Sequence, residues 1–437
     1  FPRAIRTTVM TILDDAEGLA ATGPVCDACL GRPFADRSFG LGNDERGRAL
    51  RTTLALDADE PYESPDVEAC WVCEGLCGRF EEYADRAVEA LEGIDFFTYQ
   101  VGTRVPPLVE ENGELLRVDA GLDPEAGELL KSEFNREVGK RVGQRTGKEV
   151  GFERPDVQLL IDLDTDEIDV TINSVAVYGR YRKVERDVPQ TEWPCSNCGE
   201  SGQLHGGRAC PECNGTGYRY HTSVEQEVAP PLVTALRGDE GVFHGAGRED
   251  VDALMLGDGR PFVLEVKHPH RRDVDLATIE DEINKASDAV KVDDLRFATH
   301  EMTARVKEHD ASKTYRAEVE FDASVDGAAL ADALETLEGA TVEQRTPHRV
   351  DHRRADLVRE REVYEIDGEL VDDTHATIDV HGAGGLYIKE LISSDEGRTE
   401  PSLAGLLDTA ATVTALDVLS VEGEDEPFEH PDYFRDE

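Results

Sequence analysis

Two carboxylates in a short segment flanked by glycines are the strongest candidates for chemistry in this sequence. Asp250 and Asp252 follow a Gly-Arg turn at 247–248, and a second glycine-rich turn lies at 257–259. If the segment between these turns is a strand, both carboxylates lie on the same face of it. Such an aspartate could be a nucleophile, a general base or a metal ligand, whereas a turn aspartate often only binds backbone N–H groups. Residue types alone leave these alternatives open.

A tyrosine and a lysine further along the chain could complete such a site. Tyr315 lies at the start of an expected strand at 314–321, between basic residues. Lys389 is the last lysine of the chain and lies on an expected helix at 386–393 that follows a glycine turn, so it could face an acidic partner. Taken alone, each residue is more often structural, Tyr315 as a half-buried strand residue and Lys389 as a surface residue.

Eight of the nine cysteines form four Cys-x-x-Cys pairs. Without a secretory context, such pairs indicate metal sites rather than disulfides, with reduced, unliganded cysteines as the alternative. The first two pairs predict one structural zinc site, and the last two, joined by a short glycine-rich stretch, predict a second, ribbon-like one. Cys77 could compete with Cys73 as a ligand of the first site. The predicted ligands are Cys26, Cys29, Cys70, Cys73, Cys195, Cys198, Cys210 and Cys213.

The acidity of the chain bears on what it can bind. The net charge is −48, with 94 Asp and Glu residues spread along the sequence and few lysines among the 46 basic residues. This composition indicates adaptation to a cytoplasm at molar salt rather than a cationic partner. At 1 M salt the Debye length is only about 3 Å, so only close contacts between charges matter.

Four clusters of basic residues stand out in this acidic chain, at 131–148, 178–186, 267–272 and 345–361. Positive patches with interleaved tyrosines are typical of proteins that bind RNA phosphates and stack on bases. The alternative is that these residues pair with neighbouring Asp and Glu. The RNA contacts predicted from these clusters are Lys140, Arg141, Arg145, Arg182, Lys183, Arg353 and Arg354.

The length of 437 residues predicts two large domains and a small third one, because single cores rarely exceed about 300 residues. We expect an N-terminal region at 1–190, a zinc knuckle at 191–220, a second large domain at 221–421 and a solvated acidic tail at 422–437. No apolar run reaches the about 18 residues of a membrane helix, and no signal-peptide pattern is present, so we expect a cytoplasmic protein. Periodicity predicts helices at 1–24, 80–92, 125–150, 276–291, 327–337 and 386–393, and strands at 94–118, 157–163, 168–177, 261–267, 314–321 and 375–381.

Several motifs together resemble the archaeal Pus10 pseudouridine synthases, in a halophilic form. The motifs are GREDVD…LGDGRPFVLEV at 247–266, KTYRA at 313–317, RVDHRRAD at 349–356, GLYIKELISSDEGRTEPS at 385–402, and CxxC–GRxF and NxxRG within 26–47. Residues 134–177 are similar to the C-terminal half of a THUMP RNA-binding domain. The resemblance implies an α+β protein in which a zinc-binding, THUMP-containing domain precedes an antiparallel-sheet pseudouridine synthase domain.

The resemblance also implies roles for individual residues. Asp250 matches the catalytic aspartate of the family, Tyr315 the tyrosine beneath the target base, and Lys389 the basic residue that pairs with the aspartate. The implied reaction converts uridines 54 and 55 in the TΨC arm of tRNA to pseudouridine. It needs no cofactor for catalysis, and the implied protein is a monomer that holds structural zinc and has tRNA as its partner.

One position departs from the family. Pus10 proteins tend to carry an arginine two residues after Asp252, where this chain has Leu254. We expect Arg248 and Arg260, which lie in the same motif, to bind the substrate and to offset the missing positive charge.

Two other classes of protein are weighed against a synthase. A zinc-dependent tRNA-binding protein without catalysis would share the metal sites and basic clusters, but the joint presence of all three implied catalytic residues argues against it. A THUMP-linked RNA methyltransferase would need a glycine-rich turn after the first strand of a doubly wound sheet. The glycine-rich segment at 378–385 lies near the C-terminus, and no alternation of strands and helices follows it.

Overall fold

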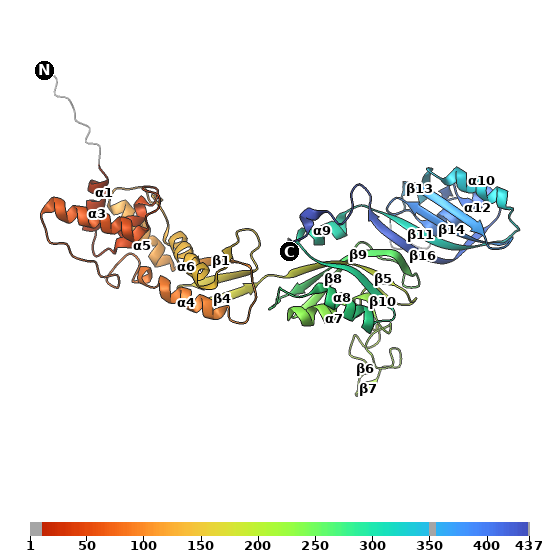
Figure 1. Ribbon diagram of the computed structural model, residues 1–437, viewed down its shortest axis with the longest axis horizontal. Helices are drawn as coiled ribbons and strands as arrows, with labels where there is room; N and C mark the ends of the chain where they lie inside the picture. Colours follow the sequence, from red (N-terminus) through yellow and green to blue (C-terminus); the bar gives the residue numbers. More distant parts are fainter. Residues whose placement is uncertain (1–10, 349–354, 436–437) are drawn as a thin grey trace, which may run out of the picture. The chain divides into compact units, whose positions relative to one another are not determined.

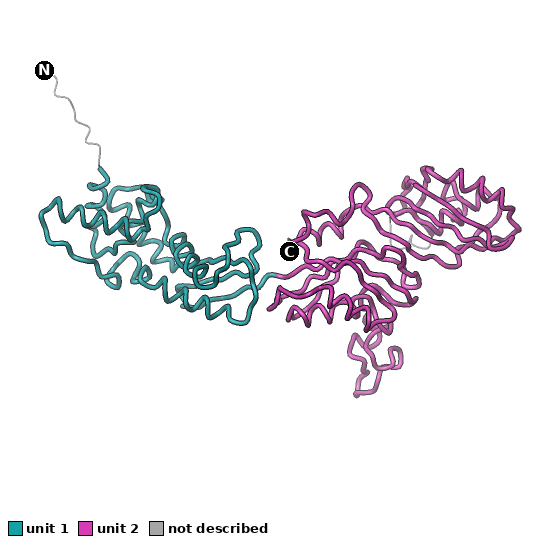
Figure 2. The backbone as a smooth tube through the Cα atoms, viewed as in Figure 1, with its two compact units in different colours: residues 1–173 teal, residues 174–437 magenta. Residues whose placement is uncertain are grey.

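The computed structural model describes residues 11–348 and 355–435 (Figure 1). The chain divides into two compact units, residues 1–173 and 174–437 (Figure 2). The predicted boundary at 190 is wrong, because β5 (Val175–Lys183) pairs with strands of the second unit on both of its sides. Among the described residues, no helix combines the length and the apolar character needed to span a bilayer.

The first unit begins with helices around the N-terminal cysteines: α1 (Ile12–Ala21), α2 (Asp27–Gly31), α3 (Asn43–Ala58) and α5 (Pro107–Asp119). The thiol of Cys26 accepts a hydrogen bond from the N–H of Cys29 and so caps α2. α2 and α3 meet at two glycines of the CxxC–GRxF and NxxRG motifs. A Cβ on Gly31 would lie 1.9 Å from the carbonyl oxygen of Asn43, and one on Gly47 would lie 1.8 Å from that of Asp27. Both positions therefore exclude a side chain.

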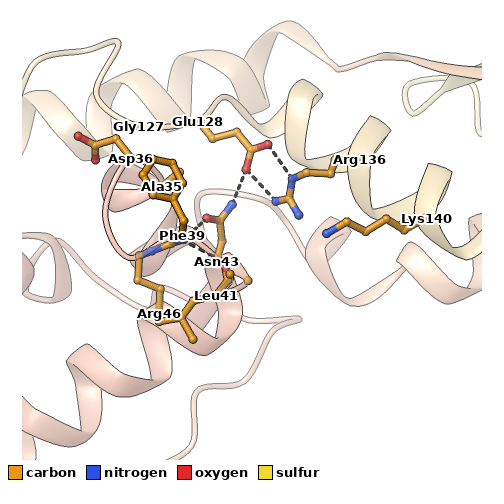
Figure 3. Close-up of a pocket in the computed structure, with 12 residues that line it drawn as sticks. Ala35, Asp36, Phe39, Leu41, Asn43, Arg46, Gly127, Glu128, Arg136 and Lys140 are labelled. Atoms are coloured by element: carbon orange, nitrogen blue, oxygen red, sulfur yellow. Dashed lines mark hydrogen bonds and ion pairs between the residues drawn. The ribbon is translucent and has the colours of Figure 1, made fainter. Parts of the chain in front are cut away.

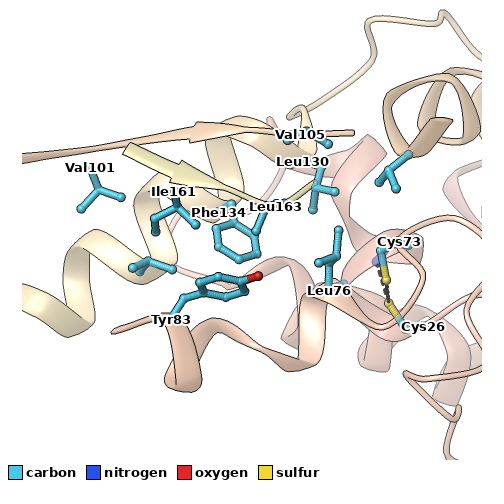
Figure 4. Packing of buried hydrophobic residues seen from close by; sticks show 14 of the residues in the cluster. Cys26, Cys73, Leu76, Tyr83, Val101, Val105, Leu130, Phe134, Ile161 and Leu163 are labelled. Atoms are coloured by element: carbon cyan, nitrogen blue, oxygen red, sulfur yellow. Dashed lines mark hydrogen bonds between the residues drawn. The ribbon is translucent and has the colours of Figure 1, made fainter. Parts of the chain in front are cut away.

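A four-stranded sheet completes the first unit, in the order β2–β1–β3–β4. Its strands are β1 (Thr98–Arg104), β2 (Glu149–Val150), β3 (Val157–Asp162) and β4 (Glu167–Ile172), and α4 (Phe80–Ala90) and α6 (Leu130–Thr146) pack on it. The rings of Tyr83 and Phe134 meet edge-on with centroids 5.3 Å apart, in the same core as Ile161 (Figure 4). The rings thus join both helices to the sheet.

Two predicted elements of this unit differ from the structure. Of the predicted strand segment 94–118, only 98–104 form a strand, β1, and 107–118 lie in the helix α5. Pro107 lies in the first turn of this helix, where its missing N–H has no partner to lose, and Asn112-Gly113 lies inside the helix. The predicted strand 168–177 is two strands, β4 and β5, on either side of the unit boundary.

A ten-stranded sheet forms the second unit, in the order β10–β5–β9–β16–β11–β14–β13–β12–β15, with β8 also paired to β9. All pairs are antiparallel except β9 with β16, so the predicted antiparallel-sheet domain is confirmed. Its strands are β8 (Glu240–Gly245), β9 (Met255–Lys267), β10 (Val290–Ala298), β11 (Ala311–Phe321), β12 (Thr341–Arg345), β13 (Val358–Leu370), β14 (His375–Gly382), β15 (Thr399–Glu400) and β16 (Ala411–Gly423), together with β5.

Two hydrophobic cores lie along this sheet. One packs α7 (Val224–Leu236), α8 (Leu276–Ala286) and α9 (Glu301–Glu308) on the strands around β5 and β9. The other packs α10 (Gly327–Leu337), α11 (Ile388–Ser393) and α12 (Leu403–Leu407) on the strands around β11 and β14. Tyr315 contacts both cores and so marks the place where they meet.

Two smaller segments belong to the second unit. A knuckle at 191–220, with the short strands β6 (Gln203–Leu204) and β7 (Arg208–Ala209), projects from the ten-stranded sheet (Figure 1). The predicted solvated tail at 422–437 is wrong for its described part. Phe428 is fully buried, Glu426 pairs with Arg305 at 2.7 Å, and Glu429 pairs with Arg180 at 2.7 Å. This segment therefore packs on the second unit through Phe428 and pairs with Arg180 on β5 and Arg305 on α9.

Candidate active site

Asp250 lies in a loop, residues 246–254, that joins β8 to β9. The segment is not a strand: the N–H of Ala253 donates to the carbonyl oxygen of Asp250 at 3.1 Å and closes a turn. Arg248 and Asp250 point to solvent, while Glu249 between them is buried. The loop therefore presents an arginine and a carboxylate outward and anchors itself by the residue between them.

The buried Glu249 carboxylate is the anchor of this loop. It accepts a hydrogen bond from the Tyr181 hydroxyl at 2.8 Å and forms ion pairs with Arg260 at 2.9 Å and Lys183 at 3.6 Å. Both cations are buried with it, and their side chains are 1% and 0% exposed. Burial lowers the pKa of Lys183, and the neighbouring Glu249 counteracts this shift. A buried charge is tolerated when it is paired, so these groups stabilise the loop as a set.

The same side chains also hold the backbone of the loop. Arg260 donates to the carbonyl oxygen of Ala246 at 2.7 Å, and Gln190 donates to that of Gly247 at 2.9 Å. Lys183 donates to the carbonyl oxygens of Asp250 at 3.3 Å and of Val251 at 3.1 Å. We call Glu249, Tyr181, Arg260, Lys183 and Gln190 the loop clamp.

The predicted RNA contacts of Lys183 and Arg260 are wrong for this structure. Both side chains are fully buried, and their donors are directed at the loop rather than at solvent. They position the candidate catalytic residue instead of binding phosphate. Sequence reasoning missed this role because a basic cluster on a strand looks the same whether its charges face water or a buried glutamate.

Three residues implied by the family resemblance come together in the structure. The Asp250 carboxylate lies 3.7 Å from the Lys389 ammonium, at the start of α11. Tyr315 on β11 is half-buried, and burial raises the pKa of its hydroxyl, with Arg260 lowering it and the charge of Asp250 adding to the rise. Tyr315 therefore stays a neutral phenol near neutral pH.

A fourth residue, Lys313, lies at this site without a role assigned from the sequence. A Cβ built on Gly247 would lie 3.8 Å from the Lys313 ammonium and 3.4 Å from Arg260. Burial, followed by the charge of Arg260, lowers the pKa of Lys313 to about 8. The only sequence signal was its place two residues before Tyr315.

An arginine from another segment lies beside Leu254, the position that departs from the family. The N–H of Leu254 donates to the Asp417 carboxylate at 2.9 Å. Arg186 binds both oxygens of Asp417, at 2.7 and 2.9 Å, and donates to the carbonyl oxygen of Asp252 at 2.7 Å. A positive charge therefore lies beside Leu254, although it comes from another segment than predicted.

With this geometry in place, comparisons identify the relatives of the chain. The family model described as "Pus10, C-terminal" matches residues 176–422, more than half of the chain, and the one described as "Pus10 THUMP domain, archaeal" matches residues 83–162. A curated relative from Halorubrum lacusprofundi, named tRNA pseudouridine synthase Pus10, is 63% identical over 98% of this chain and 100% of its own length. The chain belongs to the Pus10 family.

Other relatives agree with this assignment. A relative of the same name from Methanothrix thermoacetophila is 44% identical over 94% of this chain and 95% of its own length. A solved structure, a Cbf5-Nop10-Gar1 complex, contains a chain that is 18% identical, with a TM-score of 0.28 and 44% of each chain covered, which is too low for any conclusion. The expected THUMP domain is confirmed, and it begins well before the predicted segment at 134–177.

Most of the other predicted RNA contacts are paired with acids. Arg141 and Arg145 bind the Glu81 carboxylate at 2.7 and 2.6 Å, and Arg182 pairs with Asp293 at 2.6 Å. Lys140 is 58% exposed and pairs with Glu137 at 3.6 Å. It borders a cavity of about 500 Å³ in which Glu128 bridges Asn43 and Arg136 (Figure 3). Arg353 and Arg354 lie outside the described residues. The structure thus favours local pairing for several members of the basic clusters.

The cysteines form two sets that fit a metal. Four thiols lie within 4.8 Å of one another in each set: Cys195, Cys198, Cys210 and Cys213 as predicted, and Cys26, Cys29, Cys73 and Cys77 in the first unit. The predicted fourth ligand of the first set, Cys70, is replaced there by Cys77, while the thiol of Cys70 accepts a hydrogen bond from the N–H of Cys26 at 3.3 Å. Four thiolates at this spacing suit tetrahedral Zn²⁺, which would hold the fold and leave no open position for catalysis.

Proposed function

We propose that the chain isomerises uridine to pseudouridine in tRNA, at positions 54 and 55 of the TΨC arm, as an enzyme whose catalytic residues are Asp250, Tyr315 and Lys389. The observation that carries this proposal is an exposed carboxylate, Asp250, that is fixed by a buried clamp and lies 3.7 Å from Lys389. Membership of the Pus10 family, whose curated relatives are named tRNA pseudouridine synthases, supports the reaction and the substrate class.

The mechanism follows from the placement of these groups. The target uridine is stacked within a folded arm, so it must be flipped out, which costs a few kcal/mol. The Asp250 carboxylate promotes cleavage of the glycosidic bond by attack on the sugar or the base or by deprotonation of the sugar, with Lys389 as its positively charged partner. The freed uracil rotates and rejoins the sugar through C5.

Proton transfer then completes the isomerisation. C5 loses a proton and N1 gains one, so no oxidant, reductant or second substrate is needed. Tyr315 packs under the base, and its neutral phenol can pass the C5 proton onward. Catalysis therefore requires no cofactor, whereas zinc at the two cysteine sets would supply structure alone.

Other properties follow from this proposal. All three catalytic residues come from one chain, which supports a monomer as the active form. A tRNA substrate places the enzyme in the cytoplasm. The described candidates for phosphate contact are the exposed Arg248, which has no acidic partner among the described residues, and four residues that each pair with an acid: Lys140, Arg141, Arg145 and Arg182. The segment 378–385 runs from β14 into a turn, and β14 pairs antiparallel on both sides, which disfavours a methyltransferase.

Pseudouridine mapping tests the proposal directly. An unmodified tRNA transcript is incubated in molar KCl with the wild-type chain, Asp250→Ala or Asp252→Ala, and binding is measured in parallel. We expect wild type and Asp252→Ala to convert uridines in the TΨC arm, and Asp250→Ala to bind tRNA and convert none. Activity in Asp250→Ala combined with none in Asp252→Ala would contradict the residue assignment. Binding without conversion by the wild-type chain would replace the enzyme with an RNA-binding protein.

A further inference from the structure

An aromatic and arginine cluster lies at the stem of the metal knuckle. The N–H of Arg219 donates to the carbonyl oxygen of Trp193 at 2.9 Å, and Pro194 pairs with Tyr218, so the stem is a short antiparallel ladder. The rings of Trp193 and Tyr220 meet edge-on with centroids 5.5 Å apart.

Two guanidinium groups flank these rings. That of Arg219 lies 5.6 Å from each ring centroid, and that of Arg248 lies 5.8 Å from the Trp193 centroid. We call Trp193, Arg219, Tyr220 and Arg248 the stem platform. Arg248 belongs to the loop of Asp250, so the platform joins the knuckle to the candidate catalytic loop.

The charge environment of the platform leaves both of its arginines without an acidic partner in the part of the chain that the structure describes. Both are exposed, and among residues 11–348 and 355–435 neither forms an ion pair or a side-chain hydrogen bond with an acid. Arg141, Arg145, Arg182 and Arg186, by contrast, are each neutralised by Asp or Glu. In a chain with 94 acidic residues, two unneutralised guanidinium groups against one tryptophan leave a positive, aromatic surface open to an anionic, planar ligand.

The position of the platform indicates which ligand this is. Arg248 lies two residues before Asp250, and the clamp fixes the backbone between β8 and the turn. When a uridine is flipped into the site, its neighbours in the strand lose their stacking partner. Aromatic side chains replace such stacking with about 1–3 kcal/mol per base, and arginine binds phosphate in a bidentate manner.

We propose that the stem platform binds an unpaired nucleotide of the substrate RNA next to the target uridine, with its base on Trp193 and its phosphates on Arg219 and Arg248. This inference rests on the proposed function for the identity of the RNA. It also gives the knuckle a role, because Cys195 follows Trp193 by two residues and the N–H of Cys195 donates to the carbonyl oxygen of Gly217 across the stem at 2.8 Å. Zinc at the four knuckle thiolates would hold the platform in register.

Tryptophan fluorescence tests the platform without catalysis. The chain has two tryptophans, so Trp71→Phe leaves Trp193 as the sole reporter, and Asp250→Ala added to it prevents turnover. We expect titration with an unmodified tRNA transcript in molar KCl to quench this fluorescence. Binding of the tRNA with unchanged fluorescence would overturn the platform. If tRNA quenches the fluorescence but the chain without the Asp250→Ala substitution converts no uridine, the platform is supported and the synthase proposal is overturned.

Substitutions in the otherwise unaltered chain give a second test. Trp193→Ala is expected to raise Kd and KM for the transcript at least about fivefold, the equivalent of about 1 kcal/mol of lost stacking, with kcat changed less. Arg219→Gln should weaken binding most at the lowest salt at which the chain stays folded. Arg296→Gln is the matched control, because Arg296 also lies against an aromatic ring, 3.8 Å from that of Phe434, but is paired with Asp294. The proposal would be overturned if Trp193→Ala and Arg219→Gln each had the same Kd and the same KM as the control Arg296→Gln.

Discussion

Glu249→Gln is expected to destabilise the second unit while it leaves the first unit unchanged. The substitution keeps the shape of the side chain and its hydrogen bond with Tyr181, but it leaves the buried Arg260 and Lys183 without their counter-ion. Removal of one partner of a buried ion pair costs about 3–5 kcal/mol of stability. Because the hydrogen bond with Tyr181 is retained, we expect a loss at the lower end, about 3 kcal/mol. Molar salt will not mask the effect, since buried pairs are screened far less than exposed ones.

The two tryptophans allow each unit to be followed separately. In a Trp71→Phe background, the fluorescence of Trp193 reports the second unit, and in a Trp193→Phe background that of Trp71 reports the first. With an m-value of about 3 kcal/mol/M in urea, a loss of about 3 kcal/mol lowers the unfolding midpoint by about 1 M. Glu133→Gln is the matched control, because Glu133 forms a buried pair with Arg32 at 2.6 Å in the first unit.

The outcome separates the clamp from a generic loss of charge. We expect Glu249→Gln to shift only the Trp193 transition and Glu133→Gln only the Trp71 transition. Glu249→Gln should also lower kcat, because the loop that carries Asp250 loses its anchor. An unchanged Trp193 midpoint together with wild-type kcat would refute the argument that the buried carboxylate positions the catalytic loop.

Three further predictions concern single residues. Lys389→Ala should lower kcat about 100-fold, as removal of one electrostatic partner at an active site typically does. Lys389→Arg should retain part of the wild-type rate in single-turnover assays. Wild-type kcat in Lys389→Ala would contradict the pairing. Burial lowers the pKa of Lys313 to about 8, so the folded chain binds fewer protons than the unfolded chain from there up to the usual value of 10.5, and stability rises with pH across that window. Lys313→Met should therefore raise the unfolding midpoint by more at pH 7 than at pH 10, and the exposed Lys285→Met should change neither; a gain of equal size at both pH values would argue for packing instead. Native mass spectrometry should find two zinc ions per chain, with one lost in Cys77→Ser and none lost in Cys70→Ser, and the reverse pattern would return Cys70 to the ligand set.

The sequence predicted those parts of the site that belong to recognisable motifs. Asp250, Tyr315 and Lys389 were found through motifs of the family, since no spacing rule brings together residues so far apart in the chain. The second cysteine set was predicted from its spacing alone, because a metal imposes its own geometry on a short loop. The first set was only partly predicted, since the long connection between its pairs lets Cys77, rather than Cys70, join the other three thiols.

The loop clamp could not be predicted, because burial decides its role. β5 is buried along almost its whole length, although it carries Arg180, Arg182 and Lys183, and the sequence alone suggested a solvated basic surface. The charges are tolerated inside because Glu249, Glu422 and Glu429 come to them from other segments. Pairing of buried cations with acids from distant segments also explains the C-terminal segment. Its acids were expected in solvent and instead pair with buried arginines.

The place of β16 in the sheet has a consequence for the order in which parts of the chain fold during translation. This strand follows the other nine strands of its sheet in the chain, yet it lies between β9 and β11, and its Asp417 binds both Arg186 and the N–H of Leu254 in the loop of Asp250. Chains fold in the order in which they leave the ribosome, and pairings between distant segments form slowly. The first unit contains every strand of its own sheet, so it can fold while the second is still being translated. The THUMP domain is thus finished first, and the loop that carries Asp250 gains its contact with Asp417 only after β16 has been made.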